Sequence, residues 1–241
     1  MKRGLVRSNP VSSVDRPREK GKDKRILSPV EIGRVERAFV ELVDGAETDY
    51  ERAWIEQARV VFLTVVSAGL RRGEVLGLRW GHVNLADPAG AVLRVRETYV
   101  RGAKDTPKSE KSKRTLALSG RLATKLFDHR GRTAFAGDDE RVFCHPRTGG
   151  PLDDRLYAVT LRQALARAKI TDYMRPFHDG RHTSITNAAA SGMSPGALMA
   201  RAGHSDFKTT QGYINLAGET FREEAELADD RLFGQKSGQK S

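Results

Sequence analysis

The sequence predicts a mainly helical α+β fold with a small antiparallel sheet. Three observations predict it. Apolar residues recur at helical spacing in most of the longer segments, and two central segments are rich in strand-forming or alternating residues. Hydrophobic residues make up 38% of the 241 positions, which is sufficient for a core. The elements below follow in chain order.

The first helix is expected over residues 29–43. Ser28, Pro29 and Glu31 form the pattern of an N-cap, a proline in the first turn and a capping-box glutamate. A second helix is expected over residues 51–68, where the apolar stripe is wide enough for a central core helix, and Gly69 ends it. These two helices open the folded domain.

A short helix over residues 74–80 places Arg71 at a helix boundary, where its side chain can leave the core. Residues 92–100 are rich in β-branched and aromatic types, and residues 114–118 alternate polar with mostly apolar positions. Both segments are expected to be strands of one antiparallel sheet. The loop between them carries Lys108.

The second half of the chain is expected to be helical, with a Gly-Gly-Pro loop at residues 145–151. One helix begins near His178, and the last helix or turn carries Tyr213. The expected segments are 121–129, 156–169, 178–191, 194–202 with Gly203 as its cap, and 209–216.

The net charge of +11 favours a polyanionic partner. No long apolar run is present, so we expect nucleic acid rather than a membrane. The single cysteine, Cys144, cannot form an internal disulfide, and the basic N-terminus lacks the apolar region of a secretion signal. We therefore expect a cytoplasmic protein. Residues 1–25 hold nine Lys or Arg against three acids, which predicts an extended arm that serves as a linker or contacts the DNA backbone.

Six residues carry the chemistry that the sequence suggests. They lie in the motifs AGLRRGEVLGLRW (68–80), PKSEKSKRTLAL (107–118), FHDGRHT (177–183) and GHSDFKTTQGYINL (203–216). Cleavage of a phosphodiester by an enzyme nucleophile needs cations at the phosphate oxygens, activation of the attacking hydroxyl and a proton for the leaving oxygen. The six candidates are Arg71, Lys108, His178, Arg181, His204 and Tyr213. Together they predict a site that cuts DNA strands.

The four motifs in this order resemble the catalytic domain of the tyrosine recombinase (phage integrase) family, over roughly residues 26–216. The resemblance implies the DNA breaking-rejoining fold and site-specific recombination, as in phage integration and excision. It implies a 3′-phosphotyrosine intermediate on Tyr213, with no metal and no other cofactor. It also implies double-stranded DNA as substrate and a homotetramer on paired sites, with an accessory DNA-bending or directionality protein as a further candidate partner.

The resemblance also implies a role for each phosphate-binding side chain. Arg71 and Arg181 are expected to clamp the phosphate, since the planar fork of arginine matches its oxygens. His204 is expected to hydrogen-bond a phosphate oxygen. Lys108 is expected to protonate the leaving 5′-oxygen, although other lysines lie in the same loop. Glu74 is expected to orient Arg71 through its carboxylate.

His178 is expected to assist proton transfer from the nucleophile, and its spacing from Arg181 puts both on one helix face. His182 is assigned a structural role. His178 and His182 also form half of a zinc-site pattern, but there is no HExxH, so no metal is expected. Gly180 stands where the family usually has leucine, and a glycine there is expected to loosen the packing beside Arg181.

The expected organisation is a basic arm over 1–25, a catalytic domain over 26–233 and a flexible tail over 234–241. Residues 215–233 carry apolar positions suited to docking on a neighbouring protomer or to packing in cis. Family members usually have a preceding core-binding domain, so we expect a fragment, a truncated gene product or a compact member. Two alternatives remain open: a type IB topoisomerase-like activity, and a DNA-binding orphan domain without efficient turnover.

Overall fold

The computed structural model describes residues 24–87, 89–100, 103–105, 113–204 and 206–217. The expected basic arm, apart from its last two residues, lies outside the described residues. So do Lys108, the docking segment beyond residue 217 and the tail. No helix in the described part of the chain is long and apolar enough to cross a membrane. The prediction of a mainly helical α+β fold with a small antiparallel sheet is confirmed.

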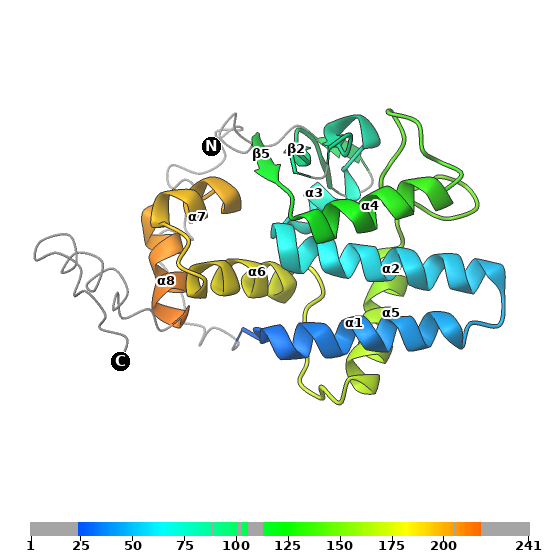
Figure 1. The fold of residues 1–241 in the computed structure, drawn as a ribbon, viewed down its shortest axis with the longest axis horizontal. Helices are drawn as coiled ribbons and strands as arrows, with labels where there is room; N and C mark the ends of the chain where they lie inside the picture. Colours follow the sequence, from blue (N-terminus) through cyan, green and yellow to red (C-terminus); the bar gives the residue numbers. More distant parts are fainter. Residues whose placement is uncertain (1–23, 88, 101–102, 106–112, 205, 218–241) are drawn as a thin grey trace, which may run out of the picture.

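The core is built around α2 (Asp49–Ala68), which packs against α1 (Pro29–Asp44) (Figure 1). The capping box of α1 is present: the Ser28 hydroxyl accepts a hydrogen bond from the Glu31 amide, and the Glu31 carboxylate accepts one from the Ser28 amide. Gly69 ends α2 in the left-handed conformation with φ of 66°. The path of the chain after α2 is therefore fixed next to Arg71.

The short helix α3 (Arg72–Leu76) begins earlier and ends earlier than expected, and a 3-10 turn over Trp80–His82 follows it separately. α3 ends early because the backbone at Gly77 lies close to the backbone at Thr98. A Cβ at Gly77 would lie 3.2 Å from the Thr98 Cα, so the strand that begins at Thr98 passes directly over the end of α3. Arg71 is the N-cap residue of α3, as expected for a side chain at a helix boundary.

The sheet has three antiparallel strands in the order β1 (Val83–Asn84), β2 (Val92–Val95) and β5 (Arg114–Ala117). The expected single strand over 92–100 is wrong, because it divides at residues 96–97. Its first half pairs with β5, and its second half, β3 (Thr98–Val100), forms a separate hairpin with β4 (Ala103–Asp105). That hairpin packs on α3.

The remaining helices appear where the sequence predicts them, with their ends shifted by up to three residues. In chain order they are α4 (Gly120–Arg132), α5 (Asp154–Arg167), α6 (His178–Ala190), α7 (Pro195–Ala202) and α8 (Phe207–Ala217). α6 extends from the main body toward α7 and α8 (Figure 1), and it packs against both α2 and α8. It therefore joins the main core to a smaller apolar cluster that includes Tyr213.

The expectation that Gly180 loosens the packing of α6 is wrong. A Cβ at Gly180 would lie 2.6 Å from Val65 Cγ1 of α2, a separation at which one of the two groups must move. Gly180 is buried, and the absence of its side chain lets α6 approach α2 closely. Since Arg181 follows directly, this close approach helps to set the position of the arginine.

Candidate active site

Arg71 is anchored on both sides of its guanidinium. Its backbone amide donates to Glu74 Oε2 at 2.8 Å, and its Nη1 donates to Glu74 Oε1 at 2.9 Å. Its Nη2 donates to the carbonyl of Gly203 at 3.0 Å, which links α3 to the end of α7. The expected contact between Glu74 and Arg71 is therefore present, and the guanidinium is held at a fixed place while its side chain remains 42% exposed.

Glu74 has a second arginine partner that sequence reasoning missed. Arg114 of β5 donates from Nη1 and Nη2 to the two carboxylate oxygens, both at 2.8 Å, and its Nε donates to the carbonyl of Arg201. Burial by itself raises the pKa of Glu74, but hydrogen bonds and charge from Arg114, with the contacts from Arg71, lower the net pKa. A signal existed in the sequence, because Arg114 alternates in phase with the buried Leu116.

Arg181 extends from the first turn of α6 into the space between α2 and α7. Its Nη1 donates to the carbonyl of Gly69 at 2.6 Å, and its Nη2 donates to the carbonyl of Ala202 at 2.5 Å. Burial and then the nearby charge of Arg71 lower the pKa of Arg181 to about 10, although Glu74 acts in the opposite direction. Arg181 therefore remains a cation at neutral pH, close to the cation of Arg71.

His204 follows the left-handed Gly203 at the end of α7, as the sequence predicts for a helix cap. Its Nε2 lies 3.2 Å from Arg181 Nη2, and its Nδ1 lies 3.1 Å from Thr210 Oγ1. Because arginine can only donate, Nε2 is the acceptor and the proton is on Nδ1. Burial, followed by the charges of Arg181 and Arg71, lowers the pKa of His204 to about 4.

Tyr213 lies on α8 with its side chain buried between two imidazole rings. Its ring stacks on His182 with centroids 5.2 Å apart and on His204 with centroids 5.7 Å apart. Burial raises the pKa of Tyr213, and the charges of Arg181 and Arg71 act in the opposite direction. The structure thus brings the expected nucleophile to the same place as three of the expected phosphate-binding residues.

His182, rather than His178, contacts the Tyr213 hydroxyl. The distance between Tyr213 Oη and His182 Nδ1 is 2.6 Å. The other ring nitrogen of His182, Nε2, lies 3.3 Å from His178 Nε2, and His178 Nδ1 lies 3.2 Å from a carboxylate oxygen of Asp179. His178 therefore reaches Tyr213 through His182. The sequence could place both histidines on one helix, but it could not show which of them faces α8.

Asp179 is the last residue in the hydrogen-bonded series that starts at Tyr213 and passes through His182 and His178. Its carboxylate is buried and accepts hydrogen bonds from Nε and Nη2 of Arg175. Burial by itself raises the pKa of Asp179, but these bonds and the contact with His178 lower the net pKa. The structure therefore forms an ordered series from the tyrosine hydroxyl through two imidazoles to a carboxylate.

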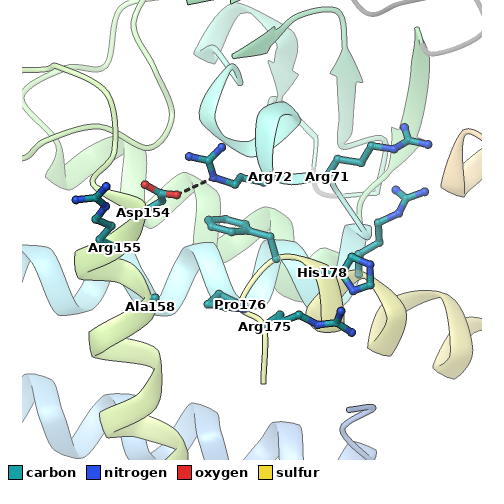
Figure 2. A pocket seen from close by; sticks show the side chains of 10 residues that line it. Arg71, Arg72, Asp154, Arg155, Ala158, Arg175, Pro176 and His178 are labelled. Atoms are coloured by element: carbon teal, nitrogen blue, oxygen red, sulfur yellow. Dashed lines mark hydrogen bonds and ion pairs between the residues drawn. The ribbon is translucent and has the colours of Figure 1, made fainter. Parts of the chain in front are cut away.

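A pocket of about 440 Å³ adjoins the site between α3, α5 and the start of α6 (Figure 2). Arg71 and His178 lie at one end of the view and Arg155 at the other, while Ala158 and Pro176 supply apolar walls. Arg72 is ion-paired with Asp154 in the upper part of this view. Five arginines line the pocket, but Arg72 is paired with Asp154 and Arg175 with Asp179, so Arg71, Arg155 and Arg181 are the lining arginines that neither of these carboxylates holds.

The sequence matches the model of the phage integrase family over residues 38–219. It is 26% identical to the tyrosine recombinase XerC of Xylella fastidiosa over 217 residues, covering 90% of this chain and 64% of that protein. It is 26% identical to XerD of Brucella suis, covering 90% of this chain and 66% of that protein. The chain thus spans slightly less than two thirds of the length of these recombinases.

Solved structures of the same kind share the fold. The Tn1549 transposon integrase in complex with circular intermediate DNA has a TM-score of 0.66 at 19% identity, covering 88% of this chain and 68% of that one. The XerH recombinase bound to its palindromic difH substrate has a TM-score of 0.63 at 16% identity, covering 88% and 54%. With the family model matched over most of its length, the chain belongs to the phage integrase family.

Proposed function

We propose that the protein is a site-specific tyrosine recombinase, which cuts and rejoins double-stranded DNA through a 3′-phosphotyrosine bond on Tyr213. The observation that supports this most directly is the convergence of Arg71, Arg181 and His204 beside the buried ring of Tyr213. Two guanidiniums and an imidazole can bind one phosphate, and the phenol of Tyr213 lies beside them. The net charge of +11 suits a DNA partner.

In the proposed cleavage step, Tyr213 Oη forms a bond to the phosphorus and the bond from phosphorus to the 5′-oxygen breaks. Arg71 and Arg181 stabilise the charge that develops on the non-bridging oxygens, since their guanidiniums are already held in place by backbone carbonyls and Glu74. Lys108, by its match to the family motif, gives a proton to the leaving 5′-oxygen. Rejoining is the reverse, with a 5′-hydroxyl attacking the phosphotyrosine.

The phenol proton of Tyr213 is proposed to move to His182 Nδ1, the nitrogen at 2.6 Å. His182 Nε2 then carries a proton that points at His178 Nε2. If His178 keeps its own proton on Nδ1 toward Asp179, its Nε2 is free to accept. Asp179 favours the cation that forms, as a carboxylate does beside any catalytic imidazole.

We further propose that residues 26–233 form the catalytic unit and that strand exchange takes place in the cytoplasm in a tetramer on two paired sites. The comparison proteins support the DNA partner: XerH is described bound to a palindromic difH substrate and the Tn1549 integrase with circular intermediate DNA. An accessory DNA-bending or directionality protein fits the same scheme.

Covalent trapping tests the proposal. The protein is incubated with labelled, nicked DNA of candidate junction sequences, denatured and separated by size, with Tyr213→Phe as the matched control. We expect a labelled protein band with a preferred sequence, and no band from the control. A band on every sequence alike would indicate a topoisomerase-like activity. DNA binding without any band, even after fusion to a core-binding domain of a related integrase, would make the chain a DNA-binding orphan.

A further inference from the structure

His178 and His182 face each other with the geometry of a metal chelate. They lie four residues apart on α6, their Nε2 atoms are 3.3 Å apart, and their rings meet edge to face at 66°. Two zinc–nitrogen bonds of about 2.0–2.1 Å at a tetrahedral angle place the nitrogens about 3.3 Å apart. The separation of the two Nε2 atoms therefore matches that of two histidine ligands on one zinc ion.

Asp179 supports His178 as a metal ligand. Asp179 accepts a hydrogen bond from His178 Nδ1, which leaves the lone pair of His178 Nε2 directed at His182. A carboxylate behind a ligating histidine fixes the ring and makes it a stronger ligand. Ligand atoms of His178, Asp179 and His182 all lie within 4.8 Å of one another, and Asp179 is itself held by Arg175.

An ion can reach this pair from solvent. The side chain of His178 is 56% exposed and lies at the edge of the pocket next to the site (Figure 2). Water can fill the remaining positions on the metal. Two imidazole nitrogens suit zinc, cobalt or nickel, whereas magnesium prefers oxygen ligands. The i, i+4 spacing of the two histidines is half of a zinc-site pattern, but spacing alone does not show that the two Nε2 atoms converge.

We propose that His178 and His182 form a zinc-binding site, and that a bound zinc ion holds Tyr213 in its inactive, protonated state. With the metal on Nε2, the remaining proton of His182 must be on Nδ1, so this nitrogen donates to the Tyr213 hydroxyl and cannot accept from it. Zinc would also occupy the His178 nitrogen that receives the next proton. This inhibitory effect rests on the proposed function, but the binding site does not.

Binding is tested on the full chain by titrating Zn²⁺ against a chromophoric chelator, and by the visible absorption of Co²⁺. We expect the wild type to bind one equivalent of zinc. The affinity of His178→Asn should be lower by at least about tenfold, because losing even a group that only hydrogen-bonds a metal ligand costs that much. The matched control is His145→Asn, because His145 lies in a loop against Tyr50. Equal affinity in wild type and His178→Asn, or no binding by the wild type, would overturn the site.

The effect on Tyr213 is tested by nitrogen NMR of the histidine rings. We expect zinc to move the His182 proton to Nδ1, and excess chelator to reverse the change. An unchanged His182 tautomer in the zinc-bound protein would overturn the inhibitory role, whether or not the chain cleaves DNA. In the trapping assay we expect zinc to remove the covalent band and chelator to restore it. If the chain forms no band even without zinc, that result contradicts the proposed recombinase activity and leaves the zinc site untouched.

Discussion

Arg114 of β5 binds Glu74 of α3 through two hydrogen bonds of 2.8 Å, and both side chains are less than 10% exposed. The same carboxylate holds Arg71, which in turn reaches the carbonyl of Gly203. One buried anion therefore ties the sheet, the start of α3 and the end of α7 together. The position of Arg71 therefore depends on this carboxylate, whereas Arg181 is held by the carbonyls of Gly69 and Ala202.

Glu74→Gln is expected to lower the free energy of unfolding by about 3–5 kcal/mol, because it removes the buried carboxylate charge that binds Arg114 through both oxygens. We expect the yield of covalent complex to fall as well, since Arg71 loses its anchor. Urea denaturation of both proteins measures the first effect. The control is Asp154→Asn, which breaks the more exposed pair with Arg72 and is expected to change stability by no more than about 1 kcal/mol. Similar losses in both variants would contradict the anchoring role of Glu74.

His204 gives an expected pH dependence of stability. Its folded pKa of about 4 lies below the ordinary value of 6.5, so between these values the unfolded chain binds the proton more readily than the folded one. Stability therefore falls as pH falls from about 6.5 to about 4. His204→Asn removes this contribution, so its unfolding free energy should depend less steeply on pH across that window. Denaturation at pH 7, 6 and 5 measures the two slopes, and parallel slopes would count against a neutral, half-buried His204.

The sequence was sufficient to predict most of the helices, because their caps and apolar stripes are local signals. Ser28 and Glu31 mark the start of α1, and Gly69 and Gly203 mark the ends of α2 and α7. The motif order also placed Arg71, Arg181, His204 and Tyr213 in one site. The helix ends depend on residues near each other in the chain, whereas the shared site follows from the resemblance of the four motifs to one family.

What the sequence missed depends on contacts between distant segments. The break between β2 and β3 follows from pairing with two different partners, β5 and β4. The partner of Arg114 lies 40 residues away, and the choice between His178 and His182 as partner of Tyr213 depends on how α8 packs on α6. A residue pattern gives the face of a helix, but not the element that will cover it.

At Gly180, α6 lies close to α2, so a larger residue there is expected to disturb the packing, whereas the sequence suggested that glycine loosens it. Gly180→Ala is expected to destabilise the protein by about 1–3 kcal/mol, because the new Cβ would overlap Val65 Cγ1 of α2. The double variant Gly180→Ala with Val65→Ala should be less destabilised than the sum of the two single variants. Thermal or urea denaturation of the four proteins completes the cycle.

Gly196→Ala is the matched control for Gly180→Ala. A Cβ at Gly196 meets no atom within 4 Å, and the residue is exposed on α7. We expect a change in stability within about 0.5 kcal/mol. If Gly180→Ala were equally neutral, α6 would have room beside Arg181, and the close packing of α6 on α2 would not be what positions this arginine.

The order of the two histidines leads to a kinetic prediction. His182→Asn is expected to lower the single-turnover rate of covalent complex formation by about 10²–10⁴, the usual contribution of a group that accepts the proton in the transition state. His178→Asn should cost less, because the first transfer from Tyr213 to His182 remains in place. Rates are compared at saturating DNA, so that differences in binding do not enter, and the melting temperature of each variant shows whether it is folded. A larger loss in His178→Asn would restore the role that the family resemblance gives to His178, and would mean that His182 turns away from Tyr213 when the phosphate is bound.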